Sequence, residues 1–188
     1  MAQAKTLTER ELKRLLDLMR GRKHAMRDRI MLLMTTWAGM RVGEVAAVMV
    51  GDVRDVTGEV REEVLLSKNQ TKGSQARAVF LSKKLRDEIA KYLIACSPIA
   101  DDKPLFYTQK RSGFTANTLT QHFHYLYKWA GIDGASSHSG RRTFITGLAS
   151  KGVSVRVLAS LAGHKSIATT QAYIDVNDDM KRRAVELI

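Results

Sequence analysis

Two segments near the end of the chain combine histidines, arginines and a tyrosine in a way that suits phosphate chemistry. In "SSHSGRRTF", His138 and Arg141 stand three residues apart. In "LAGHKSIATTQAY", His164 is followed nine positions later by Tyr173. Guanidinium and imidazole groups donate hydrogen bonds to phosphate oxygens, and a tyrosine hydroxyl is a nucleophile that forms covalent intermediates. These residue types would suit the cleavage of a phosphodiester by attachment to a side chain.

The spacing of His138 and Arg141 predicts a phosphate-binding helix start. If a helix begins near Ser139, the two side chains face the same spot, whereas Arg142 points about 100° away. Free N–H groups in the first turn of a helix also favour an anion there. The H-x-x-R motif is short, so by itself it also fits an ordinary surface helix.

Arg41 in "AGMRVGEV" is a second candidate for binding a phosphate. It stands between Gly39 and Gly43, where one predicted helix stops and another starts, and Glu44 follows three residues later. A carboxylate at that distance can hold a guanidinium in place across one helical turn. The alternative interpretation is an ion pair within a surface helix.

Lys72 and Tyr173 are further candidates for a functional role, and their positions in the predicted elements help to judge each of them. Lys72, in "QTKGSQ", lies at the tip of a predicted hairpin, where a lysine is commonly just solvated, and Lys68 is a rival for any role there. Tyr173 lies on a short predicted helix that begins after Ser166, off the centre of the side that Ile167, Gln171 and Ile174 share. That displacement favours a functional tyrosine over one more aromatic side chain in the core, whereas His164 alone would fit a structural histidine.

The elements that must position these residues are mostly helices. A capping box at Thr8 and Glu11 begins the first, and later helices are expected over about 24–38, after Gly43, from about 83 to 96, over about 116–130, within 137–152 and 154–163, and after Ser166. The segments "DVRDVTGEVREEVLLS" and "ARAVFLS" are β-branched and partly alternating, and they predict three antiparallel strands. We therefore expect a mixed, mainly α fold with a small three-stranded antiparallel sheet, in which Cys96 is buried.

Charge and composition point to a polyanionic partner. Thirty-one Lys and Arg residues outnumber 19 Asp and Glu residues, which gives a net charge of +12 and favours DNA or RNA. No apolar run approaches the roughly 20 residues of a membrane helix, so no membrane partner is expected. The first residues lack the apolar middle of a secretory signal, and the single Cys96 forbids an internal disulfide. A cytoplasmic location is the prediction.

In chain order, the candidate residues resemble the catalytic domain of tyrosine recombinases, the phage-integrase family. "AGMRVGEVAAV" looks like the first arginine box of that family, and "HSGRRTFIT…LAGHKSIATTQAYI" looks like its second. The 23 positions from Arg141 to His164 and the nine from His164 to Tyr173 match the spacing of the second box. The resemblance covers nearly the whole chain and implies the mixed, mainly α fold of that catalytic domain.

The resemblance implies how a phosphate would be bound. Arg41 and Arg141 match the two arginines that grip the scissile phosphate, and His164 matches a residue that hydrogen-bonds it. Glu44 matches an acidic residue that supports the first arginine. The implied partner is double-stranded DNA.

The resemblance also implies the covalent chemistry of a site-specific recombinase. Tyr173 matches the nucleophile that forms a 3′-phosphotyrosyl intermediate, His138 the residue that manages the tyrosine proton, and Lys72 the hairpin lysine that protonates the leaving 5′ oxygen. Because the ester to tyrosine preserves the energy of the broken bond, no ATP is expected. Because two guanidiniums and two imidazoles can neutralise the developing negative charge, neither a metal nor another cofactor is expected.

Two features depart from the family pattern. The chain has Gly140-Arg141-Arg142 where the family often has Leu-Arg-His. Family members usually carry a separate helical domain ahead of the catalytic one, but only 40 residues precede Arg41 here. We therefore expect residues 1–188 to form a single catalytic domain without an N-terminal core-binding domain, either as a fragment or as in the short fimbrial phase-switching recombinases.

The resemblance further implies assembly on DNA. Family members act as homo-oligomers, typically tetramers on DNA, in which a C-terminal tail packs on the neighbouring protomer. The tail of this chain, "DVNDDMKRRAVELI", is amphipathic enough for that role, and docking on its own domain is the alternative.

Two other functions compete with this interpretation. The segment "SVRVLASLAGHKSIATTQAYI" resembles a helix-turn-helix, so a DNA-binding regulator without catalytic activity is the main alternative. That function would leave Arg41, Lys72 and the His138–Arg141 motif without a role. A metal-dependent nuclease that uses His138 and His164 would need a pair of clustered carboxylates, which the motifs lack.

Overall fold

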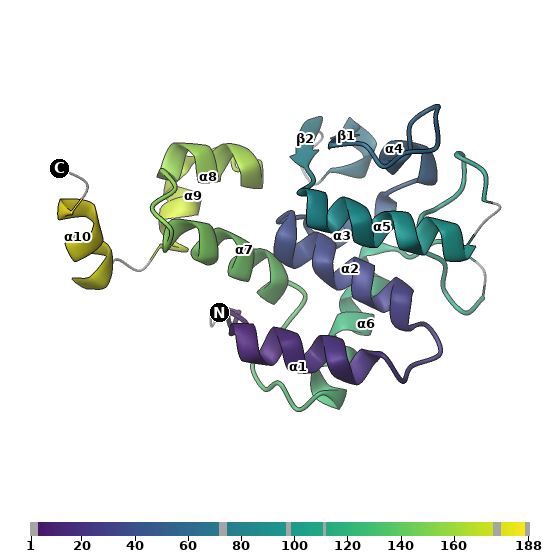
Figure 1. The fold of residues 1–188 in the computed structure, drawn as a ribbon, viewed down its shortest axis with the longest axis horizontal. Coiled ribbons are helices and arrows are strands. Elements are labelled where there is room, and N and C mark those ends of the chain that lie inside the picture. The colour runs from purple at the N-terminus through teal and green to yellow at the C-terminus, as the bar shows by residue number, and fades with distance from the viewer. Residues whose placement is uncertain (1–3, 72–74, 97–98, 111, 175–177, 187–188) are drawn as a thin grey trace.

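The computed structural model describes residues 4–71, 75–96, 99–110, 112–174 and 178–186. Within these residues the chain is mainly helical, with one small sheet (Figure 1). The elements up to the sheet are α1 (Glu9–Met19), α2 (Ala25–Trp37), α3 (Val42–Ala47), α4 (Val50–Val53), β1 (Glu63–Leu66), the 3-10 turn η1 (Lys68–Gln70) and β2 (Arg77–Phe80). The helices after the sheet are α5 (Lys83–Cys96), α6 (Ala116–Trp129), α7 (Ser139–Ala149), α8 (Val155–Ala162), α9 (Ile167–Gln171) and α10 (Asp178–Val185).

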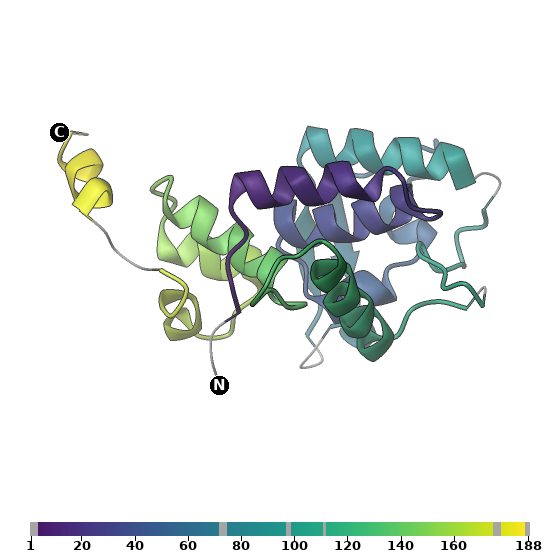
Figure 2. The same ribbon diagram turned by 90° about the horizontal axis from the view of Figure 1, so that it is seen from below.

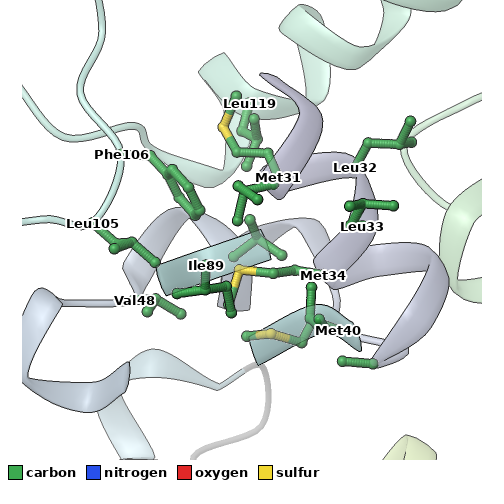
Figure 3. Packing of buried hydrophobic residues seen from close by; sticks show 14 of the residues in the cluster. Met31, Leu32, Leu33, Met34, Met40, Val48, Ile89, Leu105, Phe106 and Leu119 are labelled. Atoms are coloured by element: carbon green, nitrogen blue, oxygen red, sulfur yellow. The ribbon is translucent and has the colours of Figure 1, made fainter. Parts of the chain in front are cut away.

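Helix α2 forms the centre of the molecule. It packs against α1, α3, α5 and α7, and in Figure 1 it lies between α1 and α5. A helix surrounded on all sides must be apolar around most of its circumference, and the run from Ile30 to Met34 is buried without interruption. Figure 3 shows Met31 and Met34 packed among side chains from distant segments, including Ile89 and Phe106. Helices α1, α3, α5 and α7 thus all attach to this one central helix.

The sheet has two strands in the described residues, so the prediction of three strands is wrong in that detail. Strands β1 and β2 are antiparallel, with Val64 opposite Val79. The segment expected to form a further strand is helical at α4, because the Asp52 carboxylate accepts a hydrogen bond from the Met49 N–H at 2.8 Å and starts a helical turn. After it, extended pairing is reduced to one isolated bridge between Arg54 and Val60.

Several predicted helix ends agree with the structure. The capping box of Thr8 and Glu11 is present at the start of α1, and α6 ends just before Gly131, whose φ of +64° a glycine adopts without strain. The prediction that Cys96 is buried is wrong: its side chain is exposed at the last residue of α5. In the described part of the chain, no helix is long and apolar enough to cross a membrane.

The C-terminal helices α7, α8 and α9 lie together on one side of the molecule, and α10 lies farther out (Figures 1 and 2). Their attachment to the central helix depends on Gly140 in α7. A Cβ atom on Gly140 would overlap the Thr35 hydroxyl and lie 2.8 Å from Thr35 Cβ. The Thr35 hydroxyl is buried and donates to the Leu32 carbonyl at 2.7 Å, so it cannot easily move aside. The absence of a side chain at Gly140 therefore sets the distance between α7 and α2.

We predict that Gly140→Ala lowers the free energy of unfolding by about 1–3 kcal/mol, because the added methyl group overpacks this contact. Gly147→Ala, in the same helix, is the matched control, since a Cβ there meets nothing within 4 Å. That change should be neutral or stabilising by up to about 1 kcal/mol, because alanine favours helices. Urea unfolding of both variants measures the difference; equal effects at the two positions would contradict the close approach of α7 and α2.

Candidate active site

The end of helix α8 is where the candidate residues meet. Gly163 ends the helix in the left-handed conformation, with φ +61°, and the N–H groups of Gly163 and His164 return to carbonyls of the last turn. The next three carbonyls, those of Leu161, Ala162 and Gly163, accept hydrogen bonds from Arg77, Arg141 and Arg41, respectively. A helix end has unpaired carbonyls and a negative dipole, and both favour cations there.

The three arginines come from separate parts of the chain. Arg41 precedes the first turn of α3, Arg77 is the first residue of β2, and Arg141 lies in the first turn of α7. Arg141 is buried, and it also donates to the Gly39 carbonyl at 2.5 Å. Its side chain thus joins the α2–α3 connection to the end of α8, which brings both predicted arginine motifs to one place.

Glu44 is the carboxylate beneath two of these arginines. Its oxygens accept from the backbone N–H of Arg41 at 2.7 Å and from the Arg41 guanidinium at 2.8 Å, as the three-residue spacing predicted. They also accept from Arg77 Nε at 3.0 Å and from its terminal nitrogen at 2.6 Å. Burial alone would raise the pKa of Glu44, but the hydrogen bonds and charges of Arg77 and Arg41 outweigh it and hold that pKa below its usual value.

His164 follows Gly163 directly and lies against this cluster of cations. Its Nδ1 is 2.9 Å from the hydroxyl of Thr170, a buried residue of α9, which fixes the plane of the imidazole. Burial and the charges of Arg141, Arg41 and Arg77 lower the pKa of His164 to about 4. The imidazole is therefore uncharged at neutral pH in the free protein.

Tyr173 lies beside His164 and outside the main core. Helix α9 ends two residues before it, and the Tyr173 N–H donates to the Thr170 carbonyl at 2.9 Å. Its ring stacks on the His164 ring, with 5.7 Å between centroids and 22° between planes. The Arg142 guanidinium lies 5.6 Å from the Tyr173 ring centroid. The tyrosine is therefore half-buried next to the cationic cluster and not one of the core aromatics.

Two neighbouring cavities open at these residues. The first, of about 520 Å³, is lined by Arg41, Arg77 and His164. The second, of about 380 Å³, is lined by His138 and Tyr173. The residues that line both include Thr169, and the stacked rings of His164 and Tyr173 connect the two sides. His138 is exposed directly before α7, so its side chain reaches the second cavity without being held in the core.

The predicted hairpin lysine, Lys72, lies outside the described residues. Thr71 and Gln75, which flank that position in the part of the chain that is described, both line the larger cavity. Lys68, the rival candidate, lies in η1 with an exposed side chain and is not among the residues that line this cavity. The catalytic role of Lys72 therefore stays a prediction from the sequence.

Arg77 is the residue of the site that the sequence analysis missed. Its side chain is only 10% exposed, and it binds both Glu44 and the end of α8. A signal was present: in "ARAVF", Arg77 shares the inward face of the strand with the buried Val79. An inward-facing arginine needs an anionic partner, and Glu44 is the acidic residue of the predicted motif around Arg41.

In the described part of the chain, no three histidine, cysteine, aspartate or glutamate side chains come together as a metal site would require.

We predict that Glu44→Gln lowers the free energy of unfolding at pH 7 by about 3 kcal/mol, because it leaves partly buried guanidiniums without their anion. The low pKa of the Glu44 carboxyl stabilises the native protein above the usual value of 4.5, and this stabilisation is lost as the pH falls through the folded-state pKa. The difference between wild type and variant should therefore shrink in acid.

The matched control for that variant is Glu88→Gln, since Glu88 forms a more exposed two-bonded pair with Arg29. It should cost at most about 1 kcal/mol. Denaturant unfolding between pH 3 and pH 7 measures both variants, and a Glu44→Gln protein as stable as wild type at pH 7 would show that the buried pair is dispensable.

Proteins similar to this chain in sequence and fold are known. The tyrosine recombinase XerA of Thermococcus kodakarensis is 32% identical over 186 residues, which cover 97% of this chain and 62% of that protein. A crystal structure of a XerA recombinase superposes with a TM-score of 0.78 at 27% identity, covering all of this chain and 66% of that one. The Tn1549 transposon integrase in complex with a circular intermediate DNA has the same fold, with a TM-score of 0.80 at 19% identity over all of this chain and 67% of the integrase.

These likenesses confirm the recombinase catalytic-domain fold that the sequence resemblance implied. The chain spans about three fifths of the length of the curated relatives it matches. Residues 5–180 match the family model described as the phage integrase family. The chain belongs to the phage integrase family.

Proposed function

We propose that this chain is the catalytic domain of a tyrosine site-specific DNA recombinase. It would cut and rejoin DNA strands by transesterification through a 3′-phosphotyrosyl intermediate, without metal or ATP. The observation that carries the proposal is the convergence of Arg41, Arg141 and His164 at the end of α8, with the Tyr173 ring 5.7 Å from that of His164. The names of the relatives, tyrosine recombinases, support it.

Electrostatics support the binding of a phosphate in the larger cavity. The charges of three arginines act on His164 and help to keep a proton off its imidazole, so the local potential is strongly positive. Burial and the neighbouring Arg41 and Arg77 even lower the pKa of Arg141 to about 9. A phosphodiester anion would relieve this repulsion, and preorganised donors of this kind stabilise the charge that develops in phosphoryl transfer.

The covalent step would use the neighbouring cavity. The Tyr173 oxygen would attack the phosphorus, with His138 taking the phenolic proton, since both side chains line that cavity. The bond from phosphorus to the 5′ oxygen would break, and Lys72 would supply the proton to that leaving oxygen. Support for Lys72 comes from Thr71 and Gln75, which line the cavity on either side of it in the chain. In the reverse step, a 5′ hydroxyl would attack the phosphotyrosine and reseal the strand.

We propose double-stranded DNA as the partner and a homo-oligomer, a tetramer on DNA, as the active form. The net charge of +12 suits a DNA-binding surface. The C-terminal tail would dock on a neighbouring protomer, and the position of α10 beyond α8 and α9 suits such a contact (Figure 2). We further propose that residues 1–188 act as one catalytic domain, in the cytoplasm where its DNA substrate lies.

We predict that Tyr173→Phe binds DNA as tightly as wild type, within about threefold, yet forms no covalent adduct, because it lacks the nucleophilic oxygen. The substrate is a nicked, end-labelled duplex selected by binding to the wild-type protein, and denaturing electrophoresis detects the adduct. Tyr125→Phe is the matched control, since Tyr125 is an exposed tyrosine of α6 that lines neither cavity, and it should form adduct normally. A wild-type protein that binds the duplex without forming any adduct would favour the helix-turn-helix regulator.

We predict that Arg141→Lys lowers the single-turnover rate of strand cleavage by about 10²–10³-fold, because one ammonium cannot replace a planar fork with several donors. Arg141 also binds two backbone carbonyls, so thermal unfolding of the variant must be followed and rates compared where it is folded. Arg156→Lys, at an exposed position of α8, is the control and should cleave at the wild-type rate. Near-normal cleavage by Arg141→Lys would contradict its phosphate-binding role.

A further inference from the structure

Arg77 occupies a place in the site that no predicted role accounts for. It enters from the sheet, as the first residue of β2, and its side chain is almost fully buried. All three guanidinium nitrogens donate to protein groups: two bind the carboxylate of Glu44, and the third binds the Leu161 carbonyl at 2.9 Å. Arg77 thus joins three elements, β2, α3 and α8.

The orientation of Glu44 depends on this arginine. The carboxylate accepts four hydrogen bonds, two from Arg41 and two from Arg77, so each arginine faces both oxygens. Without Arg77, the carboxylate would be held on one side only. Because Arg41 is bound to the same carboxylate, any rotation of Glu44 would move the Arg41 guanidinium as well.

The stem of Arg77 also supports the backbone that carries His164. A Cβ atom on Gly163 would lie 2.6 Å from Arg77 Cδ, so the arginine stem packs directly on the glycine. Gly163 is also the residue whose carbonyl binds Arg41 at 2.9 Å. Arg41 is held by the Glu44 carboxylate and by the Gly163 carbonyl, and Arg77 contacts both of these residues. Gly163 immediately precedes His164 in the chain.

We propose that Arg77 is a positioning residue for the strand-cleavage reaction, which sets Arg41 and His164 relative to each other. This inference rests on the proposed recombinase function. Three of the five N–H groups of Arg77 donate to Glu44 and Leu161, so we infer that it acts through these neighbours. Because Arg77 also lines the larger cavity, the DNA affinity of its variant distinguishes this role from a direct contact with the phosphate. Its charge adds to the potential that keeps His164 neutral.

An arginine is required because the acceptors lie in different directions. A guanidinium presents several donors in one rigid plane and can bind a carboxylate and a carbonyl together, whereas a lysine ammonium is a single point charge on a flexible stem. Arg77→Lys therefore retains the charge and loses the geometry. Displacements of about 1 Å among reacting groups cost about 10²-fold in rate.

The test compares Arg77→Lys with Arg29→Lys in the full chain. Arg29 forms a similar two-bonded pair with Glu88, and its contacts join α2 to α5 away from both cavities. We expect Arg77→Lys to cleave the nicked duplex about 10–100-fold more slowly in a single turnover, with the Kd for DNA changed less than threefold. Arg29→Lys should cleave like wild type.

Hydrogen–deuterium exchange supplies a readout that does not depend on activity. In Arg77→Lys the amides of residues 160–166 should exchange at least threefold faster than in wild type, because the end of α8 loses one of its three arginines. The same amides should be unchanged in Arg29→Lys. If Arg77→Lys destabilises the fold, Arg77→Gln, which retains one donor group, should show the same local pattern.

The outcomes separate this inference from the proposed function. Wild-type exchange rates at residues 160–166 in Arg77→Lys, or cleavage at the wild-type rate, would overturn the positioning role. A loss of DNA affinity equal to the loss of rate would also overturn it, since Arg77 would then be a substrate-binding group. If the wild-type chain forms no adduct, the proposed function fails, while faster exchange in Arg77→Lys would still establish the structural link.

Discussion

The binding of three arginines to the last carbonyls of α8 is the interaction on which the rest of the site depends. Each arginine comes from a different region, so this one helix end joins the α2–α3 connection, the sheet and helix α7. The glycine that terminates α8 places His164 directly after the cluster, and the short helix α9 then returns Tyr173 to the His164 ring. Residues separated by up to 132 positions, from Arg41 to Tyr173, are thereby assembled around one backbone feature.

The same arrangement concentrates positive charge. The described contacts of Arg41 and Arg77 include one shared carboxylate, Glu44, and Arg141 binds only neutral carbonyls in the contacts given above. Buried cations with so little compensation are costly, and the low pKa values of His164 and Arg141 express that cost. In the proposed function the scissile phosphate supplies the missing negative charge, so the repulsion within the free protein becomes attraction for the substrate. Arg77 fits this picture as the group that keeps the cluster rigid.

Much of this could be predicted from the sequence because it depends on local patterns. The capping box at Thr8, the ion pair between Arg41 and Glu44 and the turn at Gly163 each follow from residues within a few positions. The ordered motif also indicated the family. What could not be predicted depends on tertiary contacts: the partnership of Arg77 with Glu44 spans 33 positions, and the close approach of Gly140 to Thr35 is set by helix packing. The prediction of a third strand was wrong because Asp52 starts a helical turn that the β-branched pattern does not reveal.

The protonation of His164 reports most directly on the positive potential at the end of α8. Nuclear magnetic resonance of imidazole-labelled protein, titrated with and without a bound duplex, measures it. We predict a His164 pKa of about 4 in the free protein, which rises when the phosphate neutralises the surrounding arginines. A His164 pKa at its usual 6.5 in the free protein, unchanged when DNA binds, would contradict an anion site at this position.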